Sequence, residues 1–250
     1  MAERTSYLPG TPCWVDLGTT DTQAAARFYG GLLGWAAAID SRPEASGYGM
    51  FTSRGLNVAG LGPQMGSGPP RWSVYVSVSD LDKTAETIAA KGGKLLAGPM
   101  DVFDAGRMAV AQDTAGSFIS IWQPGAHIGA QLVNEPGAFT WNELAASDLD
   151  QAVEFYTSVF GWGAQTSSEG AQGVTFTLDG NVACGAHAAG PGEFPAWSVW
   201  FSVQDCDASA AKAAELGGRV VVAPNDMGFG RGAVVADPQG AVFGIAVATA

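Results

Sequence analysis

Two carboxylates in matching surroundings are the residues of this chain best suited to acid–base chemistry. Asp16 follows Trp14 by two positions, and Glu143 follows Trp141 by the same two positions. A carboxyl group beside a buried indole is desolvated, which raises its pKa and suits it to act as a general acid, a general base or a hydrogen-bond partner of a ligand. Both residues are therefore candidate catalytic residues.

Other roles for these two carboxylates remain open from the sequence. Each could be solvated, paired with backbone amides of its strand, or bound to Arg107 or Arg231 as a structural ion pair. Their occurrence in both places favours a systematic role, although a shared structural role would repeat as well.

The elements that must position these residues come from an internal duplication. Residues 14–35 align with residues 141–162 at an offset of 127, with eight identities in 22 positions. The register continues downstream, where Trp72-Ser73-Val74 matches Trp197-Ser198-Val199 and the offset has drifted only to 125. The two halves are duplicates, and each is long enough to bury a core of its own.

Each half divides again into two units of the order strand, helix and three strands. In the first unit, residues 14–17 alternate as a strand, and Thr20 with Gln23 fits a capping box at the start of a helix that Gly34 ends. The second unit repeats the order from residue 72, with a helix over 80–91. We expect modules over 12–65, 71–124, 139–189 and 196–248, in domains 1–125 and 139–250 joined by a linker over 126–138.

Two motifs occur once in each half. The first, Asp-x(6)-Phe-Tyr-x(4)-Gly-Trp, spans residues 21–35 and 148–162, and the second, Gly-Arg-x(5)-Asp-x-x-Gly, spans 106–116 and 230–240. In these motifs the chain resembles the vicinal oxygen chelate superfamily of glyoxalase I, bleomycin-resistance proteins and extradiol dioxygenases. Within it, the chain is most similar to two-domain actinomycete proteins, some associated with aromatic polyketide pathways. The resemblance implies an α+β fold in which tandem βαβββ modules pair into two cupped, open eight-stranded barrels.

The resemblance also implies where a metal ion would be bound. Metal-dependent members use a His or Gln on the first strand, a His on the first strand of the next module and a carboxylate on the last strand. The six matching positions hold Trp14, Ser73 and Ser120 in the first half and Trp141, Ser198 and Gly244 in the second. Indole, serine hydroxyl and glycine are not ordinary ligands of a transition metal. We therefore expect no metal and no other cofactor.

Strand alternation then predicts what lines each cup, because residues two apart on a strand share a face. Aromatic walls with few polar groups suit a planar, largely apolar ligand; the alternative is that these aromatic side chains only fill the barrel core. The predicted ligand-binding residues, beside the carboxylates, are Trp14, Ser73, Tyr75, Phe118, Ser120 and Trp122 in the first cup and Trp141, Ser198 and Trp200 in the second.

Histidine and cysteine are scarce. His127, in the linker, and His187, near a strand end, are expected to be exposed residues without a role as metal ligand or catalytic base. The three cysteines, an odd number without framework spacing, suit a reducing cytoplasm.

Composition limits the classes of partner. The chain has 12 basic and 24 acidic side chains, a net charge of −12, which argues against binding nucleic acid or an anionic membrane surface. We find no secretory signal and expect a monomer, with a homodimer as the alternative. Residues 131–250 carry three basic and 13 acidic side chains, against nine and 11 in residues 1–130, so a cationic ligand would be sought first in the second cup.

The sequence leaves three functions open. The first is a metal-independent enzyme of secondary metabolism that binds an aromatic, polyketide-like molecule and moves a proton through Asp16 or Glu143 during cyclisation, ring opening, isomerisation or a hydroxylation-type step, with a separate oxygenase as a candidate partner. The second is a binding protein that sequesters an antibiotic. The third, a metal-dependent glyoxalase or dioxygenase, is disfavoured by the six substitutions at the ligand positions.

Overall fold

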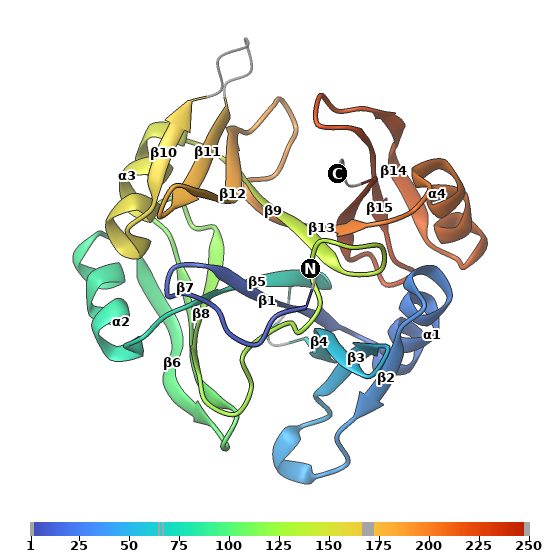
Figure 1. Cartoon of the computed structure of the whole chain (residues 1–250), viewed down its shortest axis with the longest axis horizontal. Helices are drawn as coiled ribbons and strands as arrows, with labels where there is room; N and C mark the ends of the chain where they lie inside the picture. Colours follow the sequence, from blue (N-terminus) through green and yellow to red (C-terminus); the bar gives the residue numbers. More distant parts are fainter. Residues whose placement is uncertain (1–2, 65, 67, 167–172, 248–250) are drawn as a thin grey trace.

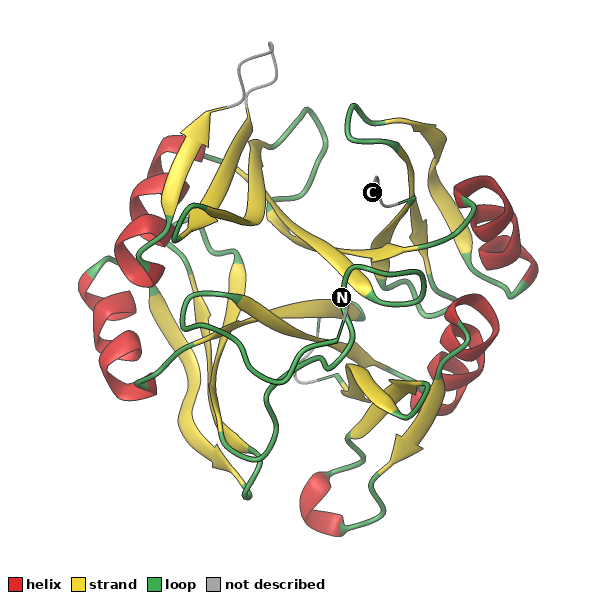
Figure 2. Ribbon diagram, in the orientation of Figure 1, coloured by secondary structure: helices red, strands yellow, loops and turns green. Residues whose placement is uncertain are grey.

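The computed structural model describes residues 3–64, 66, 68–166 and 173–247, and consists of two eight-stranded sheets with helices on their outer sides (Figures 1 and 2). The first half contains β1 (Pro12–Thr19), α1 (Thr22–Leu33), β2 (Ala36–Ile39), the 3₁₀ helix η1 (Pro43–Ala45), β3 (Gly49–Ser53), β4 (Leu56–Pro63), β5 (Arg71–Ser77), α2 (Leu81–Ala90), β6 (Lys94–Val102), β7 (Gly106–Gln112) and β8 (Phe118–Pro124). The second half contains β9 (Phe139–Ala146), α3 (Leu149–Phe160), β10 (Gly163–Thr166), β11 (Gly173–Leu178), β12 (Asn181–Ala188), β13 (Ala196–Ser202), α4 (Cys206–Glu215), β14 (Arg219–Asp226), β15 (Arg231–Ala236) and β16 (Val242–Ala246).

The two sheets have the same topology. Their strand orders are β2-β3-β4-β1-β5-β8-β7-β6 and β10-β11-β12-β9-β13-β16-β15-β14. Within each sheet the two modules lie side by side. Their first strands, β1 and β5 or β9 and β13, form the antiparallel pair that joins them. The sheets are cupped and do not close into barrels, which confirms the tandem βαβββ architecture.

Each α-helix of the described ranges begins with an aspartate cap. Asp21 accepts a hydrogen bond from the backbone N–H of Ala24 at 2.9 Å, and Asp148 does the same for Gln151 at 3.0 Å. The predicted capping box at Thr20 is wrong, because the helix begins one residue later and Asp21 supplies the capping oxygen. Gly34 ends α1 with a φ of 74°, a left-handed conformation that glycine adopts without strain.

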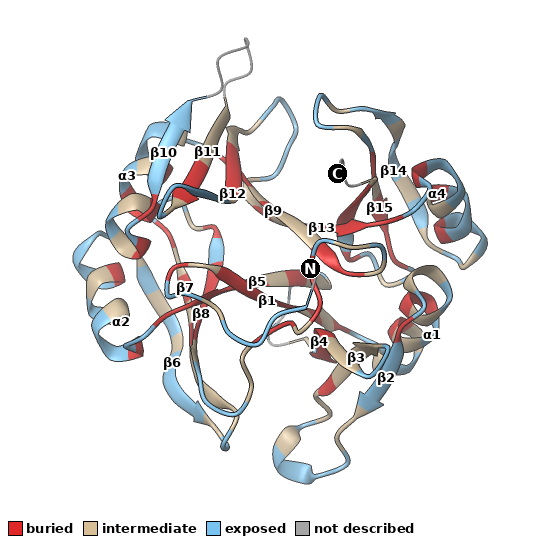
Figure 3. Cartoon of the chain, in the orientation of Figure 1, coloured by how far each residue is buried: buried red, intermediate tan, exposed pale blue. Residues whose placement is uncertain are grey.

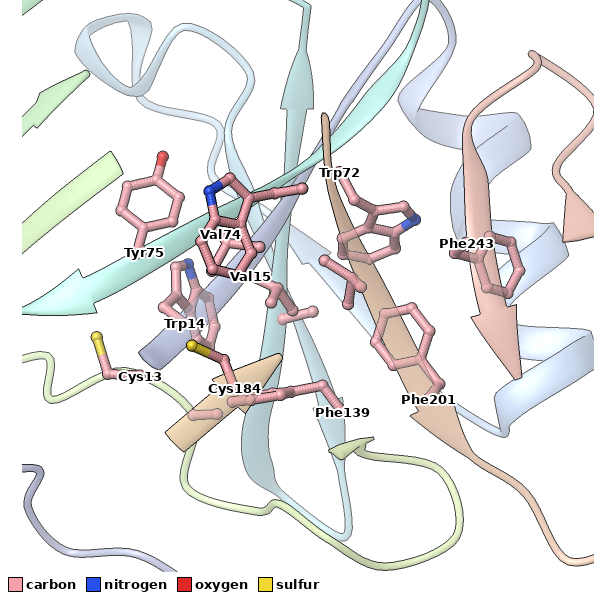
Figure 4. Packing of buried hydrophobic residues seen from close by; sticks show 14 of the residues in the cluster. Cys13, Trp14, Val15, Trp72, Val74, Tyr75, Phe139, Cys184, Phe201 and Phe243 are labelled. Atoms are coloured by element: carbon pink, nitrogen blue, oxygen red, sulfur yellow. The ribbon is translucent and has the colours of Figure 1, made fainter. Parts of the chain in front are cut away.

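The helices and the central strands join the two halves. Helix α1 packs against α4, and α2 against α3, on opposite sides of the molecule, while β5 and β13 lie side by side between them (Figure 1). Figure 4 shows Trp72 of β5 against Phe201 of β13; their ring centroids are 4.9 Å apart. Trp72 also contacts a helix, since its Nε1 donates to the Tyr29 hydroxyl of α1 at 3.1 Å.

Strand alternation separates a buried face from a cup face. Val15, Leu17 and Val74 are at most 1% exposed, whereas Asp16 and Ser73, on the other face of the same strands, are half-buried. Buried segments accordingly follow the central strands and exposed ones the outer strands (Figure 3). Among the described residues, no helix is long and apolar enough to cross a bilayer.

Candidate functional site

The sheet register of the first half brings the predicted cup residues together. Trp14 is paired with Tyr75 across β1 and β5, and Asp16 with Ser73. Tyr75 is in turn paired with Ser120 of β8. Since cross-strand partners share a face of the sheet, these five side chains lie on the concave face.

Asp16 lies at the centre of a hydrogen-bond network on this face. The Tyr75 hydroxyl donates to Asp16 Oδ2 at 2.7 Å, and the Tyr48 hydroxyl donates to the same oxygen at 3.4 Å. Trp14 Nε1 donates to the Tyr48 hydroxyl at 3.2 Å, and Ser73 also bonds to the carboxyl group. The chain therefore surrounds Asp16 with neutral hydroxyl donors.

Burial governs the ionisation of this carboxyl group. Asp16 keeps partial contact with solvent, but desolvation among the surrounding rings raises its pKa above the usual value. The hydrogen bonds from Tyr75, Ser73 and Tyr48, and the charge of Arg71, oppose this rise without cancelling it. A carboxyl group of this kind can both give and take a proton.

Tyr48 was missed by the sequence analysis as a residue of the cup. It precedes β3, and its ring lies over β4, where a Cβ atom on Gly60 would come within 2.0 Å of the Tyr48 hydroxyl oxygen. A Cβ atom on Gly62 would lie 3.0 Å from the same ring. The two glycines, alternating on one strand face, are the sequence signal for a bulky neighbour here.

The closed end of the first cup is packed with side chains. Trp14, Tyr75, Ser120 and Trp122 are each at most 7% exposed, so at this end the aromatic rings do fill the core. His127 lies against it, with its ring centroid 4.5 Å from that of Trp14. The expectation of an exposed His127 is wrong: the residue is half-buried, and desolvation lowers its pKa to about 4.

The other end of the first cup, which carries Ser73 and Phe118 and is called its open end, is less buried. Phe118 is 40% exposed at the start of β8, and the Arg71 guanidinium lies 4.3 Å from the centre of its ring. Met50 is paired with Gly60, next to Asp16, whereas Met108 is paired with Trp122 of the closed end; both half-buried methionines share the concave face. Methionine adapts its shape to neighbouring apolar groups, which suits a wall for a planar molecule.

The second cup repeats the register with different side chains. Glu143 is paired with Ser198, and Trp141 with Trp200. Trp200 Nε1 donates to the Ser198 hydroxyl at 3.2 Å, which in turn donates to the backbone carbonyl of Glu143 at 3.1 Å. The place of Ser120 is taken by Gly244, which lies under the Trp200 ring.

Glu143 has a charged partner that the sequence analysis did not anticipate. His187 Nδ1 lies 3.4 Å from Glu143 Oε1, and His187 Nε2 lies 3.1 Å from Glu193 Oε1. Hydrogen bonds to these carboxylates, Glu143 first, outweigh partial burial and raise the pKa of His187 to about 9. The expectation of an exposed His187 is therefore wrong: its side chain is 35% exposed, and its two ring nitrogens face carboxylates.

The ion pairs considered for the two catalytic candidates do not form. Arg107 instead binds Asp82 at 2.7 Å and Asp101 at 3.1 Å, and Arg231 binds Asp207. These exposed pairs connect α2 and α4 to the neighbouring hairpins. Neither arginine is bound to Asp16 or Glu143 in an ion pair.

The family model of the Glyoxalase/Bleomycin resistance protein/Dioxygenase superfamily matches residues 13–121 and again residues 137–245. The chain belongs to this superfamily. Each match covers one eight-stranded sheet, so the glyoxalase-like unit occurs twice in the chain.

Several relatives within the superfamily extend over nearly the whole chain. The CFP32 protein of Mycobacterium tuberculosis, whose name assigns it provisionally to the glyoxylases, is 40% identical over 98% of this chain and 97% of its own length. The anthracycline biosynthesis protein DnrV of Streptomyces peucetius is 36% identical over 96% of this chain and 94% of its own.

Solved structures of the superfamily share the fold. The Mn(II)-bound glyoxalase from Novosphingobium aromaticivorans aligns with a TM-score of 0.67 at 14% identity, over 96% of this chain and 82% of that one. The 2,3-dioxygenase LapB from Pseudomonas sp. KL28 also aligns with a TM-score of 0.67 at 14% identity, over 96% and 92%. At this identity the likeness concerns the fold alone.

The metal ion that this superfamily implies does not fit the residues present. In the first cup the ligand positions hold an indole whose Nε1 is a donor and two serine hydroxyls, and Asp16 is surrounded by hydrogen-bond donors. In the second cup Glu143 and Glu193 contact opposite nitrogens of His187, so these three groups do not converge on one point. Neither arrangement is a divalent-metal site, and no such group of three or more His, Cys, Asp or Glu residues occurs elsewhere in the described ranges.

Proposed function

We propose that the first cup binds a planar aromatic small molecule of secondary metabolism, and that Asp16 transfers a proton to or from it without a metal ion. The single observation that carries this proposal is the environment of Asp16: a desolvated carboxyl group, hydrogen-bonded by Tyr75 and Tyr48, on a concave face with aromatic and methionine side chains. The anthracycline biosynthesis proteins among the relatives support a fused-ring ligand.

The geometry around Asp16 supports a role as proton donor and acceptor. Both phenols donate to Oδ2, so we assign proton exchange with the ligand to Oδ1. The protonated form would donate to a developing enolate oxygen, and the ionised form would remove a proton from an acidic carbon. Cyclisation and isomerisation of an aromatic ketone both require such a transfer.

Other side chains of the cup would bind and orient the ligand. Ser73 and Phe118 lie at the open end, while Trp14, Tyr75, Ser120 and Trp122 form the closed end against which the ring system would rest. Glu143 is the weaker candidate for proton transfer, because His187 holds it in an ion pair.

Hydrogen–deuterium exchange tests the proposal directly. The protein is mixed with a panel of hydroxyanthraquinones and anthrones; binding of both is followed by tryptophan fluorescence, and exchange of the acidic methylene protons of the anthrones in D₂O by NMR. We expect acceleration of about 10²-fold or more over buffer, lost in Asp16→Asn and retained in the matched Glu143→Gln. Tight binding without accelerated exchange would instead support sequestration of an antibiotic, and exchange unaffected by Asp16→Asn would overturn the assignment of this residue.

A further inference from the structure

The two outer hairpins of the first cup meet at one point. The hairpin β2–β3, whose loop contains η1, and the hairpin β6–β7 lie at opposite ends of the strand order of this sheet. Figure 1 shows the loop and the turn between β6 and β7 at the bottom of the view, on the side away from the second half. The Arg42 guanidinium of the loop lies 5.0 Å from the centre of the Phe103 ring of the turn. A cation at this distance is attracted to the face of the ring, so the contact joins the two hairpins.

Arg42 is oriented by its own loop. Asp40 Oδ2 accepts hydrogen bonds from Arg42 Nε at 2.9 Å and from Nη2 at 2.6 Å, and Asp40 Oδ1 accepts one from the Arg42 backbone N–H at 2.9 Å. The carboxylate of Asp104, next to Phe103 in the opposite turn, also attracts the guanidinium. The cation is therefore held on one hairpin and drawn toward the other.

Phe103 has an unusual backbone conformation. Its φ is 49°, in the left-handed region, which costs free energy for a residue with a Cβ atom. The side chain is 54% exposed, so burial does not account for its position. In the second sheet the turn of the hairpin β14–β15 carries Phe229, whose ring packs against Trp200 of its own sheet with the centroids 5.7 Å apart. The aromatic residue of the first turn instead contacts the opposite hairpin.

The strength of this contact suits a closure that opens readily. Both side chains are exposed, and at an exposed site the loss of a cation–π contact changes an equilibrium by about two- to fivefold. Asp16 and Ser73 lie on the concave face between the two hairpins. A contact that joins the hairpins limits the size of molecule that reaches this face.

We propose that Arg42 and Phe103 form a latch, which holds the hairpins β2–β3 and β6–β7 together across the first cup and opens to admit a planar molecule. The identity of that molecule rests on the proposed function. The latch itself is a property of the free chain, and its opening can be measured without the ligand.

A cysteine reporter on the concave face tests the proposal. Ser73→Cys is introduced into the full chain, and its reaction with dithiodipyridine, a neutral aromatic disulfide, is followed by absorbance. The three native cysteines are at most 1% exposed, and the chain without the reporter gives the background. We expect Phe103→Gly and Arg42→Gln each to raise the reaction rate by about two- to fivefold, and to raise it less with the small reagent methyl methanethiosulfonate. Phe194→Gly, at an exposed phenylalanine of the other half, is the matched control and should leave the rate unchanged.

The opposing outcomes are equally defined. An unchanged rate in Phe103→Gly or in Arg42→Gln, or an equal rise in Phe194→Gly, would overturn the latch. Glycine adopts the φ of residue 103 without strain, so Phe103→Gly is expected to fold, and thermal melts verify that a faster reaction does not come from unfolding. If the reporter responds as expected and no anthrone binds, the proposed function fails while the latch stands.

Discussion

The Tyr29 hydroxyl of α1 donates a hydrogen bond to Asp237 Oδ2 at 3.2 Å, 208 positions away and in the other half of the chain. Tyr156 of α3 makes the reciprocal bond to Asp113 Oδ2 at 2.9 Å. Each tyrosine thus connects the Phe-Tyr motif of one half to the Gly-Arg-x(5)-Asp motif of the other. The recurring motifs therefore connect the two halves, and the four residues of these bonds do not belong to either cup.

Removing either hydroxyl is expected to destabilise the junction. Tyr29→Phe leaves the Trp72 N–H and Asp237 Oδ2 without this partner, and Tyr156→Phe does the same to Trp197 and Asp113. Each change should lower the free energy of unfolding by about 1–3 kcal/mol. Urea denaturation measures the loss, and the double variant should show the sum of the two within about 0.5 kcal/mol. Wild-type stability in both single variants would contradict this role.

Asp16→Asn is expected to change the pH dependence of stability. The folded pKa of Asp16 is raised, so its protonated form favours folding, and ionisation costs stability as the pH rises above the unfolded value of about 3.9. The asparagine variant does not ionise and should gain stability relative to wild type by at most about 1.4 kcal/mol per pH unit above that value. Denaturation at pH 4.5 and pH 7.5 compares the two; an advantage that falls with rising pH would refute the raised pKa.

The opposite sign is expected for His187. Its folded pKa of about 9 exceeds the unfolded value of 6.5, so its stabilisation is complete below pH 6.5 and is lost as the pH rises through 9. The side chain is 35% exposed, and solvent screening limits the effect to about 1 kcal/mol. Wild type should lose this amount between pH 6.5 and pH 9.5 relative to His187→Gln, as measured by chemical denaturation. Parallel stability profiles would show that the ion pairs contribute nothing.

Gly244→Ala is expected to displace Trp200. The added methyl would overlap the fused ring at 2.0 Å, and relief of this overlap should cost about 1–3 kcal/mol and shift the tryptophan emission. Gly190→Ala is the matched control, because its Cβ atom would meet its nearest neighbour at an ordinary 3.7 Å. Thermal melts of the two variants make the comparison, and equal stability would contradict the flat packing of Trp200.

Periodicity and duplication predicted the repeated order of strands and helices, and the family resemblance supplied the pairing of the modules into eight-stranded sheets. Alternation along β1 and β5 placed Trp14, Asp16 and Ser73 on one face; the observed register pairs Asp16 with Ser73 and Trp14 with Tyr75. The exception at Thr20 reflects two adjacent residues that can both cap a helix; the backbone conformation of Asp21 decides between them.

The site was less predictable, because its decisive contacts come from turns and loops. Tyr48 reaches Asp16 from outside β3, and Glu193 reaches His187 from the loop after β12, so strand parity does not apply to either residue. Whether Asp16 and Glu143 have neutral or charged partners depends on these contacts. Two carboxylates at equivalent positions consequently differ in chemistry.

The reciprocal bonds of Tyr29 and Tyr156 have a consequence for assembly. Contact between the halves is made by the helix pairs and by β5 with β13 as well as by residues 126–138, in which Ala130, Leu132 and Ala138 are fully buried and Gly137 hydrogen-bonds to both halves. Cutting the chain in this segment would leave two fragments with complementary surfaces, which should recombine as a heterodimer at micromolar concentration. The molecule is in this sense a dimer with one covalent connection, and each fragment needs the other to complete the burial of its helices.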